Sequence, residues 1–303
     1  MRVGGFPRLD APPRARARRP RALDLQARGQ VTEAHRFTYT WKDAVLYALG
    51  IGARKDELDY LFEGRGPKVF PSFAVVPEFA PMFEALRMTN ANFEMVVFGG
   101  ERVRVHKPFA PSATVVSRST VRGIYDMKKM AQVVIDTAIE SESGEALATT
   151  TSSIICRGEG GFGGEPPPRE DTGISLPPSD TTPDFHIEQQ TSPEQALLYR
   201  LSGDVNPLHA DPEFAKTVGF ERGPILHGLA TYGHMVRHAI LGACGGDAQK
   251  LTAFECQFRK PVWPGDTLVT DGYIVAPGKI AMRVSVKERQ ENVVSGAWAT
   301  FSA

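Results

Sequence analysis

The sequence has little cysteine, no long apolar run and no excess of charge of one sign. Its three cysteines, Cys156, Cys244 and Cys256, lack metal-like spacing, so we expect reduced thiols and neither a disulfide framework nor a zinc site. No apolar run approaches the roughly 20 residues of a membrane-spanning helix. The 35 Lys and Arg residues balance 35 Asp and Glu residues, which gives no reason to expect a nucleic-acid partner. These absences predict a cytoplasmic protein that binds neither membranes nor nucleic acid.

The first 30 residues differ in composition from the rest. They contain eight arginines and only two acidic residues. Organelle transit peptides are also rich in arginine and poor in acids, but they carry serine, which this stretch lacks. We therefore expect residues 1–30 to be a disordered leader, and a targeting segment or a mis-set start codon both remain open. The C-terminal residues are not a peroxisomal address.

The rest of the chain divides into two similar halves. Residues 157–183 are rich in Gly, Pro and charge, which predicts a linker between a first domain at 31–156 and a second at 184–303. Tyr47-Ala-Leu-Gly resembles Tyr199-Arg-Leu-Ser at an offset of 199 − 47 = 152. The Lys-Pro pairs at 107–108 and 260–261 match at 260 − 107 = 153. The near agreement of the two offsets favours an internal duplication.

Each half follows the same order of predicted elements. A helical segment comes first, at residues 41–63 and 193–218, and strand-like segments rich in Val, Ile and Thr follow. These strands are expected at 114–121, 130–139 and 146–156 in the first half and at 253–258, 267–275 and 280–288 in the second. Helices followed by strands predict an α+β fold with an antiparallel sheet.

Residues 199–212, YRLSGDVNPLHADP, concentrate polar side chains. Pro207 lies between Asp204 and His209 and disfavours a continuous helix, so we expect a turn that directs both side chains inward. A carboxylate and an imidazole on one loop can hold one water, where one group takes a proton and the other gives one, as hydration of an activated alkene requires. The alternative is that Asp204 caps a turn and His209 is a satisfied polar residue. Asp211 and the proline after it predict the start of a further helix.

A buried helix is expected next. From Leu226 the chain is mostly apolar and rich in small residues. A free amide near Gly228 would point the positive end of the helix dipole at an acceptor such as a thioester carbonyl, although close helix packing alone would also explain the glycine. His227, His234 and His238 are interpreted as packing or surface residues rather than metal ligands.

Together these segments resemble a known family. YRLSGDVNPLHADPEFA, followed by GF and PILHGL, is similar to the hydratase-2 motif of MaoC-like enzymes, and QFRKPVWPGDTL continues the likeness. FTYTWKDAVLYALGIGA, YLFEG, FPSF and RGEGGFGG resemble the hydratase-2 part of the peroxisomal multifunctional enzyme type 2. The resemblance covers residues 31–303.

The resemblance implies a double hot-dog fold, in which each half wraps an antiparallel sheet around a long central helix. It implies that Asp204 and His209 are catalytic and that Asn206 belongs to the active-site turn. It places the amide that meets the thioester oxygen at Gly228. Phe258, which could also belong to a purely structural hairpin, is expected near the bound acyl-CoA.

The sequence departs from the family pattern at several positions. Gly99, the candidate CoA-side contact of the first half, stands in Phe-Gly-Gly-Glu where the family usually has His-Gly-Glu. The duplication places Gly52 at the position of Asp204 and Glu57 at that of His209, so we expect a degenerate first half with room for a long or bulky acyl tail, and one active site per chain. Glu-Arg-Gly at residues 221–223 is expected to change the length of the loop beside the site.

The function implied by the resemblance is that of an (R)-specific 2-enoyl-CoA hydratase, which adds water syn to a trans-2-enoyl-CoA and gives the (3R)-3-hydroxyacyl-CoA. An acyl-CoA is the expected substrate and a homodimer the expected assembly, with no metal and no cofactor. Hot-dog domains serve several functions, so the fold alone does not decide between them. A 3-hydroxyacyl-thioester dehydratase working in the reverse direction, an acyl-CoA thioesterase and a non-catalytic acyl-CoA binding protein remain alternatives.

Overall fold

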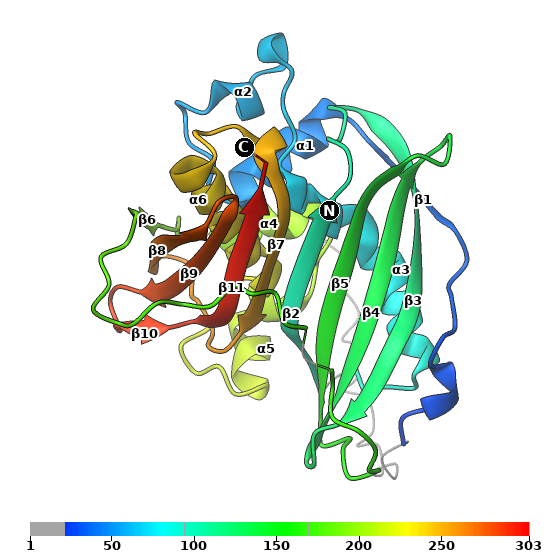
Figure 1. Ribbon diagram of the computed structural model, residues 1–303. Coiled ribbons are helices and arrows are strands. Elements are labelled where there is room, and N and C mark those ends of the chain that lie inside the picture. Colours follow the sequence, from blue (N-terminus) through cyan, green and yellow to red (C-terminus); the bar gives the residue numbers. More distant parts are fainter. Residues whose placement is uncertain (1–21, 94, 169, 303) are drawn as a thin grey trace, which may run out of the picture.

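Antiparallel strands form the sheet in both halves of the chain (Figure 1). This computed structural model describes residues 22–93, 95–168 and 170–302. Its strands are β1 (His35–Tyr39), β2 (Val96–Val105), β3 (Ala113–Asp126), β4 (Met130–Ser141), β5 (Ala146–Arg157), β6 (Phe185–Gln190), β7 (Leu251–Phe258), β8 (Thr267–Ala276), β9 (Lys279–Val286), β10 (Glu291–Asn292) and β11 (Val294–Phe301). All six segments predicted as strands coincide with strands, apart from their ends.

The strands of the two halves form one continuous sheet. Over the described residues its order is β1-β3-β4-β5-β2-β7-β11-β9-β8-β6, with β10 paired to β9. The halves join where β2 and β7 pair in antiparallel register, from Gly100 opposite Gln257 to Arg104 opposite Ala253. This junction brings side chains of the first half next to the segment that carries the catalytic candidates.

One long helix packs against the sheet in each half. The helices are α1 (Trp41–Gly50), α2 (Leu58–Leu61), α3 (Val75–Met88), α4 (Gln195–Tyr199), α5 (Pro212–Thr217) and α6 (Gly228–Ala243). In the first half α3 lies on β3 and β4, and in the second half α6 lies on β6, β7 and β8 (Figure 1). A sheet wrapped around a central helix, twice in one chain, is the double hot-dog fold that the resemblance implies.

The two helical segments predicted from the sequence are broken. The expected helix at 41–63 ends at Gly50, because Gly52 adopts a left-handed backbone conformation with a φ of 80°. The expected helix at 193–218 is likewise interrupted at Gly203, which has a φ of 129°, and at Pro207. The central helix α3 was not predicted from the sequence pattern; only the family resemblance required one in this half.

The packed part of the chain begins earlier than we expected. Residues 1–21 of the predicted leader lie outside the described residues. Residues 22–30 contain a short 3-10 helix, Leu25–Ala27, and bury Leu23 and Ala27 against the first half. The assignment of these nine residues to a disordered leader was therefore wrong, because their apolar side chains complete the core.

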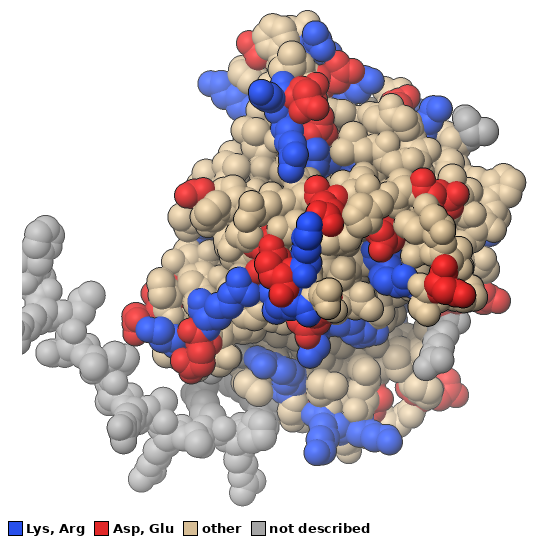
Figure 2. Space-filling view, turned by 90° about the vertical axis from the view of Figure 1, so that its left-hand side faces the viewer, with Lys and Arg blue, Asp and Glu red and all other residues tan. Residues whose placement is uncertain are grey.

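The described surface combines both signs of charge. On the face shown in Figure 2, Lys and Arg side chains are interspersed with Asp and Glu. Ion pairs such as Lys287–Glu188 at 2.6 Å and Lys216–Glu213 at 3.0 Å link them on exposed elements. Among the described residues, no helix is both long and apolar enough to cross a bilayer.

Two carboxyl groups are buried in the first half. Glu78 on α3 and Glu101 on β2 are each 1% exposed, and both contact the hydroxyl of Ser152. No Lys, Arg or His of the described chain forms an ion pair with either. Burial raises the pKa of Glu78 to about 7, and burial together with the charge of Glu78 raises the pKa of Glu101 well above its usual range. Both groups therefore favour their protonated forms.

We expect Glu101→Gln to raise the free energy of unfolding at pH 8 by about 1–3 kcal/mol and to change it little at pH 4. The folded protein binds these protons more tightly than the unfolded chain does. Stability is therefore fully present below the ordinary pKa of 4.5 and is lost as the pH rises through about 7. Glutamine imitates the protonated acid at every pH. Urea unfolding at both pH values measures the difference, with Glu142→Gln on the surface as the control, and an equal loss of stability at both pH values would contradict the interpretation.

Candidate active site

The loop between α4 and α5 is shaped by its own side chains. The Asp204 carboxylate accepts a hydrogen bond from the backbone N–H of Asn206 at 3.1 Å. The side-chain oxygen of Asn206 accepts one from the backbone N–H of Leu208 at 3.0 Å. Pro207 starts a single 3-10 turn, Pro207–His209. The Asp211 carboxylate then caps α5, as predicted from the sequence. These local bonds turn the chain twice within six residues, so Asp204 and His209 face the same space.

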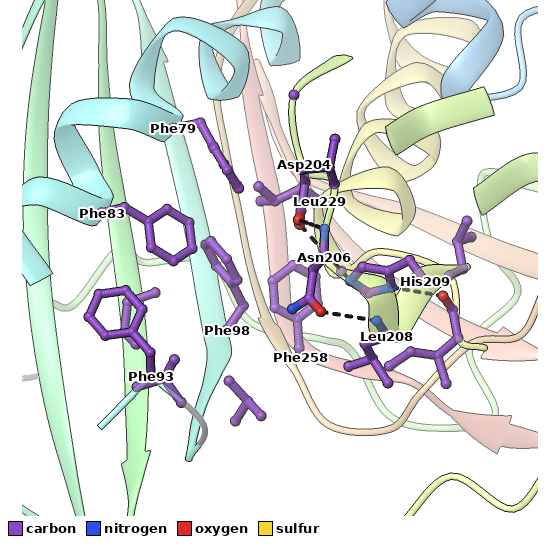
Figure 3. Close-up of a pocket in the computed structure, with 18 of the residues that line it drawn as sticks. Phe79, Phe83, Phe93, Phe98, Asp204, Asn206, Leu208, His209, Leu229 and Phe258 are labelled. Carbon is purple, nitrogen blue, oxygen red and sulfur yellow. Dashed lines mark hydrogen bonds and ion pairs between the residues drawn. The ribbon is translucent and has the colours of Figure 1, made fainter. Parts of the chain in front are cut away.

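Asp204 and His209 lie opposite each other at the wall of a cavity (Figure 3). The Asp204 Oδ2 and His209 Nε2 atoms are 4.0 Å apart, which is too far for a direct hydrogen bond. His209 donates its Nδ1 hydrogen to the Ile225 carbonyl at 2.8 Å. In the neutral imidazole this bond leaves the lone pair on Nε2, the atom that faces Asp204. A reactant placed between the two groups could contact both.

Burial favours the neutral form of both side chains. It lowers the pKa of His209, although the nearby Asp204 charge partly opposes this. It raises the pKa of Asp204 above its ordinary value, and the His209 charge partly opposes that shift. The two shifts favour a basic nitrogen on His209 and a protonated carboxyl on Asp204, which is the direction that acid–base catalysis needs.

His227 contacts both Asp204 and His209. Its ring stacks on that of His209, with centroids 3.6 Å apart and an interplanar angle of 25°. Its Nε2 donates to the Asp204 carbonyl at 3.0 Å, and burial lowers its pKa to about 2. The sequence interpretation of His227 as a packing or surface residue agrees with its burial, and the structure adds which ring it packs on. His234 and His238 do lie buried on α6, among packing contacts.

Gly228 lines the same cavity at the first residue of α6. The first amides of a helix have no partner within the helix, so the helix presents free donors and a positive dipole end here. The ring of Phe258 covers Gly228 at van der Waals distance, and a Cβ at this position would lie 3.6 Å from that ring. The Asn206 oxygen bonds to the backbone, and its amide nitrogen stays on the cavity side (Figure 3).

The first half supplies an aromatic wall to this cavity, which has a volume of about 860 Å³. The wall consists of Phe79, Phe83, Phe93 and Phe98 (Figure 3). The rings of Phe79 and Phe83 lie 4.7 Å apart, and Phe93 lies 5.8 Å from Phe83. Sequence reasoning missed all four. The four-residue spacing of Phe79 and Phe83 was the available signal, because residues at that spacing share one face of a helix.

Comparisons with known proteins find matches to both halves of the chain. Residues 37–158 match the MFE-2 hydratase 2 N-terminal domain, and residues 176–296 match the MaoC like domain. The peroxisomal enoyl-CoA hydratase 2 of Arabidopsis thaliana is 33% identical over 279 residues, which cover 86% of this chain and 90% of that protein. The 3-hydroxyacyl-thioester dehydratase Y of Mycobacterium tuberculosis is 36% identical over 274 residues, which cover 88% of this chain and 92% of that protein.

A solved structure extends the likeness to the fold. The MaoC-like dehydratase from Phytophthora capsici superposes with a TM-score of 0.82 at 30% identity, over 92% of this chain and 98% of that one. This chain belongs to the MaoC-like hydratase 2 family. In this family member, both matched domains contribute to one cavity, the first with aromatic side chains and the second with the polar loop.

The polar cluster of this hydratase 2 family member also has the composition of a metal site. Ligand atoms of Asp204, His209 and His227 all lie within 4.8 Å of one another. A shared ion would have to lie about 2.1 Å from a nitrogen of each ring and near both ring planes. Rings stacked at 3.6 Å and 25° direct their in-plane lone pairs nearly parallel, so these lone pairs do not converge on one ion. The geometry favours acid–base work over metal binding.

Gly99 has a different position from the other predicted site residues. It lies at a bulge of β2, between Phe98 and Gly100, and is not among the described residues that line the cavity. A Cβ at Gly99 would come within 2.7 Å of the Ile155 side chain on β5. The glycine therefore permits close packing of two strands, and the structure gives it no contact with the site. Its neighbour Phe98 lines the cavity instead.

The corresponding positions of the first half are occupied by the second half. Gly52 is covered by His234 and Gln189, whose nitrogens would lie within 2.5 Å of a Cβ there. The Glu57 carboxylate accepts hydrogen bonds from Arg237 of α6 at 2.8 and 3.0 Å. Hydrogen-bonded side chains of the second half therefore occupy the space around Gly52 and Glu57, where a second active site would lie.

Proposed function

We propose that this chain is a 2-enoyl-CoA hydratase of the (R)-specific type, in which Asp204 and His209 are the acid–base pair. It adds water syn to a trans-2-enoyl-CoA and gives the (3R)-3-hydroxyacyl-CoA. The observation that carries the proposal is the meeting, in one cavity, of the largely buried Asp204 carboxyl, the buried His209 imidazole and the start of a long helix. The enoyl-CoA hydratase 2 and dehydratase relatives support the same reaction class.

The reaction follows from the positions of these groups. The Gly228 amide donates to the thioester oxygen and withdraws electrons from the double bond. His209 Nε2 takes a proton from water as the water oxygen bonds to C3, and the electron pair of the double bond moves into the thioester enolate. Asp204 then gives its proton to C2, and proton exchange between His209 and Asp204 restores the starting state. Because the two groups are coupled, their pKa values belong to the pair rather than to either residue.

The same residues would catalyse dehydration of a 3-hydroxyacyl thioester, so the direction depends on the supply of substrate. An assay of the purified protein with crotonyl-CoA tests the proposal through loss of the enoyl-thioester absorbance. Chiral analysis of the product tests the (3R) assignment. Release of free CoA thiol without hydration would indicate a thioesterase, and binding without turnover would indicate an acyl-CoA binding protein.

The remaining expectations concern assembly and location. A homodimer and an acyl-CoA partner are the proposed interactions, with no nucleic acid and no cofactor. A cytoplasmic location stays a prediction from the sequence. Relatives such as the Arabidopsis thaliana enzyme are named peroxisomal, so fractionation of cells against a peroxisomal marker is the measurement that decides between the two locations.

We expect Phe83→Trp to lower kcat/KM for a decenoyl-CoA about ten- to a hundredfold more than for crotonyl-CoA. Phe83 lies one helical turn beyond Phe79, roughly 6 Å further along α3 at 1.5 Å per residue. A larger ring there obstructs a long tail, whereas a four-carbon chain ends before it. Phe83→Leu is the matched control, because the smaller side chain enlarges the cavity at the same position. It should not lower kcat/KM selectively for the long-chain substrate. An equal loss for both substrates would contradict the proposed direction of the acyl tail.

A further inference from the structure

The loop that connects α5 to α6 forms one side of the active cavity. Phe220 and Ile225 of this loop line the cavity, and the Ile225 carbonyl accepts the Nδ1 hydrogen of His209 at 2.8 Å. Gly219 and Gly223 both adopt left-handed backbone conformations, with φ of 95° and 101°. A loop with two such glycines has few local restraints of its own, so its position depends on the contacts that fasten it.

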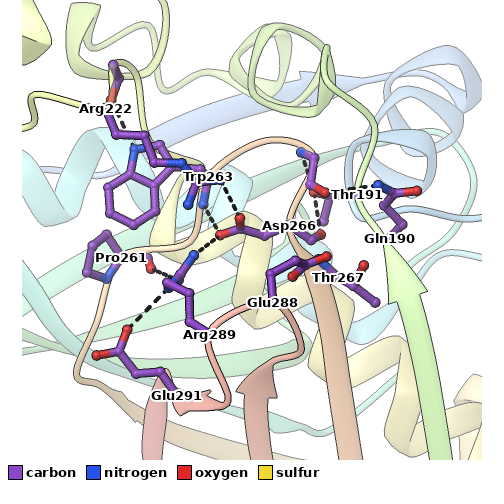
Figure 4. Close-up of polar contacts among 12 residues, drawn as sticks. Gln190, Thr191, Arg222, Pro261, Trp263, Asp266, Thr267, Glu288, Arg289 and Glu291 are labelled. Carbon is purple, nitrogen blue, oxygen red and sulfur yellow. Dashed lines mark hydrogen bonds and ion pairs between the residues drawn. The ribbon is translucent and has the colours of Figure 1, made fainter.

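Arg222, at the middle of this loop, makes two side-chain contacts that fasten it (Figure 4). Its guanidinium donates to the Asp266 carboxylate at 2.7 Å and lies over the Trp263 ring, 4.6 Å from the centroid. Trp263 in turn donates its indole hydrogen to the Gly223 carbonyl at 3.2 Å. The Arg222 side chain is half exposed, but its carboxylate partner is 1% exposed, so the bond ties a surface loop to the interior.

The anchor for Arg222 is itself rigidly held. The other Asp266 oxygen accepts hydrogen bonds from Arg289 at 2.6 Å and from the Trp263 amide at 2.8 Å. Arg289 covers Trp263 as well, with 5.0 Å between the guanidinium and the ring centroid (Figure 4). The buried carboxylate therefore keeps a cationic partner when Arg222 is removed, and the fold does not depend on Arg222.

Beyond Arg222, backbone hydrogen bonds also attach the loop next to the site. The Ile225 amide donates to the Leu208 carbonyl at 3.3 Å, next to His209. The Leu226 amide donates to the Val262 carbonyl at 2.8 Å, one residue before Trp263. The Arg222 contacts and these backbone bonds together hold the Ile225 carbonyl that accepts from His209.

We propose that Arg222 is a positioning residue of the hydratase site: by fastening this loop to Asp266 and Trp263 it holds the Ile225 carbonyl that fixes the tautomer and orientation of His209. The proposal rests on the proposed function of Asp204 and His209. Arginine suits this position because its planar guanidinium can stack on an indole and donate to a carboxylate at the same time, which lysine cannot match.

Arg222→Gln and Arg222→Lys test the proposal, with Arg118→Gln as the control. Arg118 on β3 is similarly exposed and makes one ion pair with Glu140, far along the sheet from the loop. We expect Arg222→Gln to lower kcat for crotonyl-CoA about tenfold with a smaller change in KM, Arg222→Lys to recover part of that loss, and Arg118→Gln to have no effect. Nitrogen NMR of the histidine rings should show a loss of the Nδ1–H form of His209 in Arg222→Gln and no such loss in the control Arg118→Gln.

The NMR measurement separates this proposal from the proposed function. If the wild-type protein hydrates no enoyl-CoA but the His209 signals still shift in Arg222→Gln, the positioning role stands and the enzymatic proposal fails. If Arg222→Gln melts below the assay temperature, Trp263→Phe replaces it, because phenylalanine leaves a smaller aromatic ring beneath Arg222 and removes the indole donor to Gly223; it must shift the His209 signals in the same direction. Unchanged His209 signals together with kcat within twofold of the wild type would overturn the proposal.

Discussion

Asp204→Asn and His209→Gln are each expected to lower the hydration rate by about two to four orders of magnitude, as is usual for loss of a general acid or base. Asparagine keeps the hydrogen bond from the Asn206 amide but has no proton to give to C2. Glutamine in place of His209 lacks the basic nitrogen that faces Asp204 at 4.0 Å. Each change removes one of the two proton transfers and leaves the Gly228 amide and the aromatic wall in place. Rates with crotonyl-CoA, measured on purified protein, test the expectation.

The control for these variants lies on the same loop. Asp211 caps α5, and asparagine caps helices about as well as aspartate does. Asp211→Asn should therefore keep hydration within about twofold of the wild type and change the melting temperature little. Near-normal turnover in Asp204→Asn or His209→Gln would end their assignment as the acid–base pair. A double variant should be no slower than the slower single variant, because residues that act as a unit are not additive.

The catalytic loop could be predicted from the sequence because its geometry is local. Asp204, Pro207 and His209 lie within six residues, and the bonds that shape the turn come from the loop itself. The helix start at Gly228 follows from an apolar run and a preceding turn. Such features depend on steric rules that apply to any chain.

The aromatic wall could not be predicted in this way. Phe79 and Phe98 lie more than 100 residues before Asp204, and only the pairing of β2 with β7 brings them to the same cavity. The partner of His227 could not be predicted for a related reason: the sequence shows one histidine at the start of an apolar helix, and the stack on His209 is a tertiary contact. The role of the Ile225 carbonyl leaves no pattern in the sequence, because every residue has a backbone carbonyl.

The internal duplication predicted from the sequence gives a physical reason to expect no second site in the first half. At the offset of 153, Glu84 of α3 corresponds to Arg237 of α6, since 84 + 153 = 237. Beside Asp204, α3 presents phenylalanines and leaves a cavity; beside Gly52 and Glu57, α6 presents His234 and Arg237 and fills the space. The two central helices therefore differ in effect: α3 leaves a cavity beside Asp204, and α6 fills the equivalent space beside Gly52. The cavity lined by first-half phenylalanines opens towards Asp204 and His209 of the second half, and room there for a bulky tail stays a prediction.

Arg237→Met is expected to lower the free energy of unfolding by about 3–5 kcal/mol, the usual cost of leaving one member of a buried ion pair alone. The side chains of Arg237 and Glu57 are only 4% and 11% exposed, so water replaces little of the lost contact. Gln189, which accepts from Arg237 and donates to the Gly52 carbonyl at 2.8 Å, also loses a partner.

The double variant Arg237→Met/Glu57→Leu should be more stable than Arg237→Met alone, because it removes the stranded carboxylate as well. Urea unfolding of the wild type, both single variants and the double variant forms a complete cycle, from which we expect a coupling of about 2 kcal/mol or more. The hydration rate should change little even where the free energy of unfolding falls, since neither Arg237 nor Glu57 lines the cavity. Additive effects in this cycle would mean that Glu57, at the position equivalent to His209, has a role independent of Arg237, and the first half would then have to be reconsidered as a site in its own right.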